Sequence, residues 1–229
     1  LTYEYDSTHA LPDRLRTNAA GATHYVIDAT YTNLYEPNLT TRATALSGSG
    51  FVQSGRYYDE ATGRVVRSPV IRSVAPSYIR NTFYDYDQAG NFLKIDDNPG
   101  TGTRDTQCFT YDHQRRLTEA WTPTSADCDQ EPTAAGLGGP AKYWQSWDFG
   151  TPTDAKGRVG NRLAQTEPAT PAGDVTTTYS YPEPGADQPH ALSGLSRTDN
   201  AGTSTATFDY DNRGNTVSRP GPNGQQTLT

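Results

Sequence analysis

One short sequence unit recurs along this 229-residue chain, and it restricts the possible folds more than any other feature. The unit consists of an aromatic residue, Asp, two or three spacer residues, usually Gly, and then a polar and an apolar residue. Clean copies lie near residues 57–66, 84–95, 109–120 and 208–219. Looser copies lie near Tyr3, Trp147 and Tyr179, and residues 31–42 hold a strongly divergent one. We therefore treat residues 1–229 as one array of about seven or eight copies, because such internal repetition is typical of repeat architectures.

Each position of the unit has a physical role in a β-hairpin. Tyr84 and Tyr86 are two residues apart, so their rings lie on one face of a strand. The carboxylate of Asp87 can accept a hydrogen bond from a backbone N–H two residues on, and Gly90 can supply the positive φ that closes a type I turn with a bulge. The turn residues of the clean copies are Asp59, Gly63, Asp87, Gly90, Asp112, Asp211 and Gly214. Because a lone hairpin cannot bury its aromatic face, successive copies should pair edge to edge.

The sequence therefore predicts an all-β fold, in which antiparallel hairpin repeats form a curved sheet, a spiral strip or a partial barrel. Hydrophobic residues make up only 33% of the chain, which leaves disorder as an alternative. Two observations favour a folded chain. The net charge is only −7, and the 15 Tyr and 3 Trp residues supply apolar area that aliphatic residues would otherwise provide.

The charge and hydropathy patterns argue against two classes of partner. The sequence pI is near 5.0 and the 19 basic residues are scattered, whereas a nucleic-acid-binding surface needs clustered Lys and Arg. No apolar run approaches the ~20 residues of a membrane-spanning helix. The sequence begins without Met or a signal peptide and stops inside a predicted strand, so we expect both ends to be cuts within a longer polypeptide.

Cys108 and Cys128 are the two cysteines of the sequence. A metal site needs more ligands at close spacing, so this pair favours a disulfide and an oxidising compartment. The protein is therefore expected to be secreted or to lie at the cell surface. Two free buried thiols are the alternative.

The Tyr-Asp-x-x-Gly-Asn/Arg-apolar unit resembles the YD repeat of bacterial RHS proteins, which the teneurins and the C components of insecticidal toxin complexes share. The resemblance covers most of the chain and implies that the repeats spiral as one long sheet into a hollow shell. It also implies that bacterial members enclose a C-terminal toxin polypeptide, often released by self-cleavage in a segment after the repeats. These residues contain no such segment, so we do not expect self-cleavage activity in this chain. Pro182, which replaces the expected Asp, and Arg115, which replaces the expected Gly, depart from the pattern.

An aromatic cluster is the best candidate for contact with a partner, because flat rings can stack on sugars or hold a peptide. It consists of Trp121, Tyr143, Trp144 and Trp147. The alternative is that Trp147 is the aromatic residue of its own repeat and packs inward. Residues 122–141 are rich in Pro, Ala and Gly, and we expect them to form a long surface loop.

No catalytic, cofactor-binding or metal-binding residue is predicted. Asp85, Asp87 and Gly90 imitate part of a calcium loop, but the Glu that should end such a loop is absent and a hairpin turn explains all three. The four histidines lie far apart, with no nucleophile beside them. The many Asp residues recur at the turn position, where the architecture already accounts for them.

These observations favour a structural protein over an enzyme. The leading hypothesis is a shell segment of an RHS-type secreted protein that encapsulates a C-terminal effector or toxin polypeptide. Its partners would be that polypeptide and the neighbouring repeats of the parent chain, with no cofactor. A cell-surface adhesin or glycan-binding module that uses exposed aromatic residues is the second hypothesis, and a hydrolase is the third.

Overall fold

A computed structural model describes residues 1–16, 24–43, 50–151, 153–170, 173–222 and 224–228. Strands dominate the described residues, which also contain a 3₁₀-helix, η1 (Ala134–Gly136), and a four-residue α-helix, α1 (Ala155–Arg158). The chain divides into two compact units. The first unit contains residues 1–108, 123–128 and 138–140, and the second contains residues 109–122, 129–137 and 141–229.

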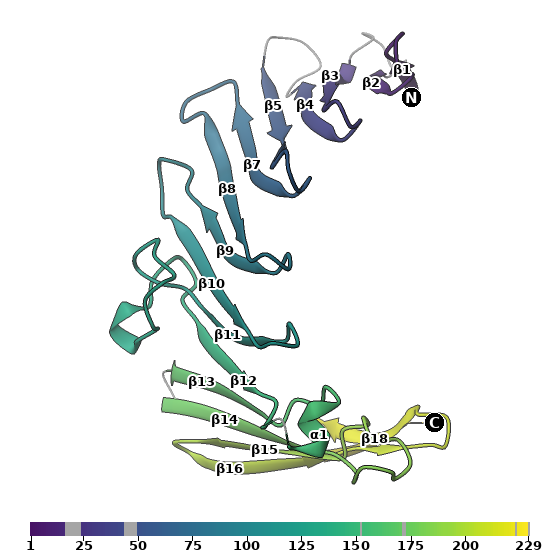
Figure 1. Ribbon diagram of the computed structural model, residues 1–229, viewed down its shortest axis with the longest axis vertical. Helices are drawn as coiled ribbons and strands as arrows, with labels where there is room; N and C mark the ends of the chain where they lie inside the picture. Colours follow the sequence, from purple (N-terminus) through teal and green to yellow (C-terminus); the bar gives the residue numbers. More distant parts are fainter. Residues whose placement is uncertain (17–23, 44–49, 152, 171–172, 223, 229) are drawn as a thin grey trace. The chain divides into compact units, whose positions relative to one another are not determined.

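The first unit is an antiparallel sheet in which sequence neighbours are also spatial neighbours (Figure 1). Its strands are β1 (Thr2–Tyr5), β2 (Pro12–Arg16), β3 (His24–Tyr31), β4 (Pro37–Ala43), β5 (Phe51–Gly55), β6 (Tyr57–Tyr58), β7 (Val65–Arg72), β8 (Tyr78–Tyr86), β9 (Phe92–Asp97) and the start of β10 (Asp105–Tyr111). The short strands β5 and β6 pair with successive parts of β7. Each hairpin thus pairs with the hairpins before and after it.

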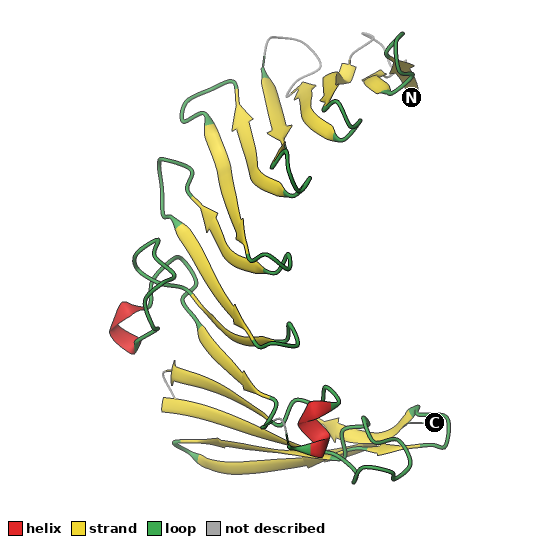
Figure 2. Cartoon of the chain, in the orientation of Figure 1, coloured by secondary structure: helices red, strands yellow, loops and turns green. Residues whose placement is uncertain are grey.

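The second unit continues the same up-and-down order and adds a separate three-stranded sheet (Figure 2). The first set comprises the end of β10, β11 (Leu117–Trp121), β12 (Trp144–Asp148), β13 (Ala164–Thr170), β14 (Gly173–Ser180), β15 (Gly194–Asp199) and β16 (Gly202–Thr207). The three-stranded sheet comprises β17 (Asp209–Tyr210), β18 (Thr216–Gly221) and β19 (Gly224–Thr227).

The predicted all-β fold of antiparallel hairpins is confirmed. The four clean sequence units lie at the turns β6–β7, β8–β9, β10–β11 and β17–β18. The rings of Tyr84 and Tyr86 both contact Phe92 on the returning strand, with centroids 5.7 and 4.8 Å apart. The aromatic-x-aromatic pattern therefore places both rings on the same face of the hairpin, as its period of two requires.

Few side chains in the described residues are fully buried. The buried hydrophobic ones are Cys108, Ala120, Trp121 and Val175, and the polar ones are Thr82, Asp96, Thr106, Thr122 and Asn161. With so little apolar burial, strand ladders and specific polar contacts must supply a large share of the stability. No helix in the described part of the chain has the length and apolar character needed to cross a membrane.

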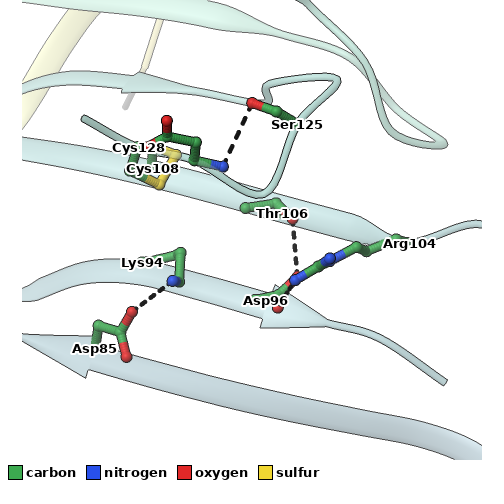
Figure 3. The surroundings of a disulfide bond; sticks show 9 residues. Asp85, Lys94, Asp96, Arg104, Thr106, Cys108, Ser125 and Cys128 are labelled. Carbon is green, nitrogen blue, oxygen red and sulfur yellow. Dashed lines mark hydrogen bonds and ion pairs between the residues drawn. A yellow bond between two sulfur atoms is a disulfide. The ribbon is translucent and has the colours of Figure 1, made fainter. Parts of the chain in front are cut away.

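The insert between β11 and β12 is anchored at several points. The predicted disulfide is present and joins Cys108 of β10 to Cys128, with Cα atoms 5.5 Å apart (Figure 3). Residues 122–141 do not form an exposed loop throughout, because Thr122 is only 1% exposed. Its N–H donates to the carbonyl oxygen of Tyr143 (3.0 Å), and the Tyr143 N–H donates to the Thr122 hydroxyl (3.0 Å).

Candidate functional site

The Asp residue of the repeat unit organises its turn through hydrogen bonds to the residue four positions on. In the β8–β9 turn, the backbone N–H of Asn91 donates to Oδ1 of Asp87 (2.9 Å), and the Asn91 side-chain amide donates to Oδ2 (2.7 Å). Asn215 makes the same two contacts with Asp211, both at 2.9 Å. One carboxylate thus spans the whole turn, which explains why a polar donor follows the Gly of the unit.

In the turn between β10 and β11, the Asp also bonds to the residue four positions on, but that residue is an arginine and not an asparagine. The backbone N–H of Arg116 donates to Oδ1 of Asp112 (3.0 Å), and its Nε donates to Oδ2 (2.6 Å). The expected hydrogen bond two residues on is also present, from Gln114 N–H to Asp112 (2.8 Å). The β6–β7 turn is one residue longer, and there the N–H and hydroxyl of Thr62 donate to Asp59 at 2.8 and 2.7 Å.

In each of these turns, the residue after the spacer residues has a positive φ, in the left-handed region of backbone conformation. Gly63, Gly90 and Gly214 have φ angles of 67°, 98° and 85°. Arg115, which departs from the sequence pattern, has φ of 63° and so adopts the conformation predicted for the glycine it replaces. A side chain in this conformation costs about 1–2 kcal/mol relative to glycine.

The divergent copy in residues 31–42 forms the same turn with different residues. Thr32 occupies the Asp position, and its hydroxyl accepts hydrogen bonds from the N–H groups of Leu34 and Glu36, both at 3.2 Å. Tyr35 occupies the Gly position with φ of 62°. A threonine hydroxyl can imitate an Asp turn, which a search for Tyr-Asp alone cannot find.

In the first unit, the tyrosine before three successive turns links one copy to the preceding one. The hydroxyl of Tyr31 donates to the carbonyl oxygen of Pro12 (2.6 Å), that of Tyr58 to Pro37 (2.9 Å) and that of Tyr86 to Val65 (2.7 Å). In each case the acceptor is the first or second residue after the preceding turn. In the second unit, the Tyr210 hydroxyl donates to the carbonyl oxygen of Leu192 (3.1 Å). These bonds are not among the features predicted from the sequence, although the presence of Tyr and not Phe directly before the turn was a signal for them.

A second set of contacts joins neighbouring turns. Arg64, at the end of the β6–β7 turn, donates from Nη1 to the backbone carbonyl of Asp87 (2.9 Å) in the next turn, and its guanidinium lies 5.6 Å from the ring centroid of Tyr86. In the second unit, the side-chain amide of Gln188 donates to the backbone carbonyl of Asp211 (2.6 Å). Together with the tyrosine bonds, these contacts join successive turns along the turn edge of the first unit, and they join the β17–β18 turn to the segment before β15 in the second unit.

The hydrogen bonds hold the turn carboxylates in their ionised form. Burial alone would raise the pKa of Asp87, but the side-chain and backbone donors of Asn91 outweigh it, and the pKa lies below its ordinary value. Donation from the Asn215 side chain is the main cause of the lowered pKa of Asp211, and the Thr62 hydroxyl is the main cause for Asp59. A general acid needs a raised pKa, so these carboxylates do not suit acid catalysis.

The calcium-like run has other uses in the structure. Asp87 accepts the two hydrogen bonds from Asn91, and Asp85 forms an ion pair with Lys94 at 2.7 Å (Figure 3). Across the described ranges there is no group of three His, Cys, Asp or Glu side chains placed to hold a metal ion.

The structure does not gather the four predicted aromatic contact residues into one patch. Trp121 is 3% exposed and lies opposite Trp144 in the strand register, while Trp147 lies opposite Gln165. Trp144 and Trp147 are three residues apart on β12, so their side chains lie on opposite faces. The indole N–H of Trp144 donates to Oε1 of Glu119 (2.7 Å), and Tyr143 is half-buried against Thr122.

An ion pair between the buried carboxylate of Asp96 and the partly exposed side chain of Arg104 lies close to the disulfide in the first unit (Figure 3). Asp96 is 5% exposed and accepts hydrogen bonds from Nε of Arg104 (2.7 Å) and from the Thr106 hydroxyl (2.8 Å). Burial raises the pKa of Asp96, but these donors outweigh that effect and lower the pKa below its ordinary value. Because the carboxylate is fully engaged, we assign it a structural role.

Comparison with known proteins yields structural neighbours and no sequence relatives. No protein-family model and no curated protein matches the chain. The crystal structure of TcdB2-TccC3 without its hypervariable C-terminal region aligns with 93% of this chain and 9% of that chain, at 15% identity and a TM-score of 0.49. The Photorhabdus luminescens Tc holotoxin pore aligns with 92% of this chain and 8% of that chain, at 16% identity and a TM-score of 0.49.

A porin-like protein from Bacteroides uniformis aligns with 94% of this chain and 92% of that chain, at 10% identity and a TM-score of 0.37. The chain spans less than a tenth of the two toxin-complex chains.

Proposed function

We propose that these residues form part of the wall of a shell in an RHS-type secreted protein, and that the shell encloses a C-terminal effector or toxin polypeptide. The observation that carries the proposal is the hydrogen bond from three turn tyrosines of the first unit, Tyr31, Tyr58 and Tyr86, to the backbone of the preceding copy. A copy bonded in this way contacts its neighbours along the sheet, so the sheet can be extended by adding copies. An extendable sheet is what a wall around a large cargo requires.

The wall would act by covering its cargo and not by catalysis. The carboxylates of the clean turns are occupied by hydrogen bonds from their own turns, and their pKa values are lowered. The disulfide between Cys108 and Cys128 supports a secreted protein, because such bonds persist in oxidising compartments. The expected partners are the enclosed polypeptide and the neighbouring repeats.

Protease protection tests the proposal on the whole parent protein. The polypeptide that follows the repeats is expressed within the parent protein and also alone, and each sample is treated with a nonspecific protease. We expect the enclosed polypeptide to survive in the intact parent protein and to be digested when it is expressed alone. Equal rates of digestion, or a parent protein with no polypeptide beyond its repeats, would contradict the proposal.

A further inference from the structure

An arginine side chain fills the groove between two successive turns of the first unit. The β6–β7 and β8–β9 turns lie at the same edge of the sheet (Figure 1), and Arg64 is the residue directly before β7. Its Nη1 donates to the backbone carbonyl of Asp87 (2.9 Å) and its Nη2 to that of Gln88 (3.3 Å). Its guanidinium lies 5.6 Å from the ring centroid of Tyr86. The second of these turns therefore presents a ring and two backbone acceptors to a guanidinium from the turn before it.

The second unit uses an arginine at the same position of a turn. Arg116 lies directly before β11, its Nη1 donates to the backbone carbonyl of Gly157 (2.6 Å), and its guanidinium lies 4.3 Å from the ring centroid of Phe149. Both arginines thus reach from the end of one turn to a backbone acceptor and a ring in the next connection at that edge.

One groove earlier in the first unit, a glutamate takes the place of this arginine. Glu36 lies directly before β4, as Arg64 lies directly before β7. A Cβ atom added to Gly90 would lie 3.1 Å from Nη2 of Arg64, and a Cβ atom added to Gly63 would lie 3.9 Å from Oε1 of Glu36, so the two side chains lie in corresponding places. The glutamate is shorter, and its Oε2 accepts a hydrogen bond from the Thr32 hydroxyl of its own turn (3.3 Å). A hollow of about 610 Å³ remains between its turn and the next one.

The far wall of this hollow repeats the groups that surround Arg64. Tyr58, Asp59 and Glu60 line the hollow, and they correspond in the turn unit to the three residues that Arg64 contacts. Within the described ranges, no side chain donates to the backbone carbonyl oxygens of Asp59 and Glu60. The receptor for a guanidinium is therefore repeated here, and the preceding turn supplies no arginine to it.

The charge of the hollow favours a cation, and its rim favours a polypeptide. Three acidic residues, Glu36, Asp59 and Glu60, line it together with one basic residue, Arg56. Glu60 is exposed and has no partner in the described part of the chain. Leu34 also lines the hollow and is 73% exposed, so it offers an apolar contact that a small cation could not use.

We propose that this hollow binds an arginine side chain of another polypeptide. The guanidinium would lie against the ring of Tyr58 and donate to the carbonyl oxygens of Asp59 and Glu60. It would take the position that Arg64 holds in the next groove, and Glu36 would form an ion pair with it. The exposed leucine at the rim would contact an apolar residue beside the arginine. This inference does not depend on the proposed shell.

Titration of the 229-residue chain with short blocked peptides, followed by nuclear magnetic resonance, tests the site. The peptides carry leucines around one central residue, which is arginine, lysine or citrulline; citrulline keeps the shape of arginine but has no charge. We expect the arginine peptide to shift the amide signals of residues 58–60 and to bind at least about tenfold more tightly than the citrulline peptide. The lysine peptide should bind more weakly than the arginine peptide, because an ammonium lacks the planar fork of donors.

Glu36→Arg supplies the missing arginine within the chain. We expect this variant to have a higher melting temperature and to lose binding of the arginine peptide, because its own guanidinium would occupy the hollow. Glu36→Gln should leave the hollow open and weaken binding through the loss of one carboxylate. The control is Glu131→Gln, which removes the same charge from an exposed residue of the insert and should leave binding unchanged. Circular dichroism of each variant shows whether it is folded.

Four results would overturn the proposal. They are an arginine peptide that shifts no signal of residues 58–60, a citrulline or lysine peptide that binds as tightly, undiminished binding to Glu36→Arg, and a free guanidinium ion that binds as tightly as the peptide. The last result would assign the hollow to a small cation and not to a polypeptide.

Discussion

Removal of one tyrosine hydroxyl tests whether the copies are linked as the structure indicates. In Tyr86→Phe the ring stays against Phe92, and only the hydrogen bond to the carbonyl oxygen of Val65 (2.7 Å) is lost. A net hydrogen bond contributes about 1 kcal/mol, and the half-buried carbonyl left without its donor adds to the loss. We therefore expect the free energy of unfolding to fall by about 1–2 kcal/mol.

Tyr84→Phe is the matched control. Tyr84 lies two residues earlier on β8 and its ring also contacts Phe92, but its hydroxyl has no hydrogen-bond partner in the described part of the chain. Its removal should change the free energy of unfolding by less than about 0.5 kcal/mol, as is usual for a surface substitution.

Urea unfolding followed by far-ultraviolet circular dichroism measures both variants. Hydrogen exchange of the β7 and β8 amides adds a local measurement, and it should show faster exchange in Tyr86→Phe alone. If the two variants lose the same amount of stability, the copy-to-copy bond contributes nothing and the reasoning is refuted.

Three further outcomes are expected. Arg115→Gly should raise the free energy of unfolding by about 1 kcal/mol, because it relieves a left-handed side chain; an unchanged or lower melting temperature would refute the turn assignment. The lowered pKa of Asp96, held by Arg104, stabilises the fold above about pH 4, and this contribution should disappear as the pH falls through the folded-state pKa. Melting curves from pH 7 to pH 2 should therefore fall less steeply in Asp96→Asn than in the wild type. Reduction of Cys108–Cys128 should cost about 3 kcal/mol in urea unfolding, and no loss would mean that the insert is held by other contacts.

Local sequence signals were sufficient to predict the hairpins. The rings of Tyr84 and Tyr86, the carboxylate of Asp87 and the positive φ of Gly90 all act within one turn, so their roles follow from spacing alone. Arg115 departs from the sequence pattern, yet it keeps the left-handed conformation of the Gly it replaces, with φ of 63°, because the rest of its turn follows the unit. The disulfide could also be predicted from the sequence, because a single pair of cysteines leaves one possible connectivity.

Features that depend on strand register were not predictable. The acceptor of Tyr86 lies 21 residues earlier, and only the pairing of adjacent hairpins brings the two together. Arg42, Arg72 and Arg80 share a face for the same reason, although they are far apart in the sequence. Conversely, Trp144 and Trp147 are close in sequence, but strand alternation separates their side chains.

Electron cryomicroscopy of the whole parent protein tests the central claim most directly. If the repeats form a wall around a cargo, the map should show residues 1–229 as successive antiparallel hairpins with one face toward an interior that contains density for a further polypeptide. A map in which both faces of this sheet lie in solvent, with no enclosed polypeptide, would contradict the account.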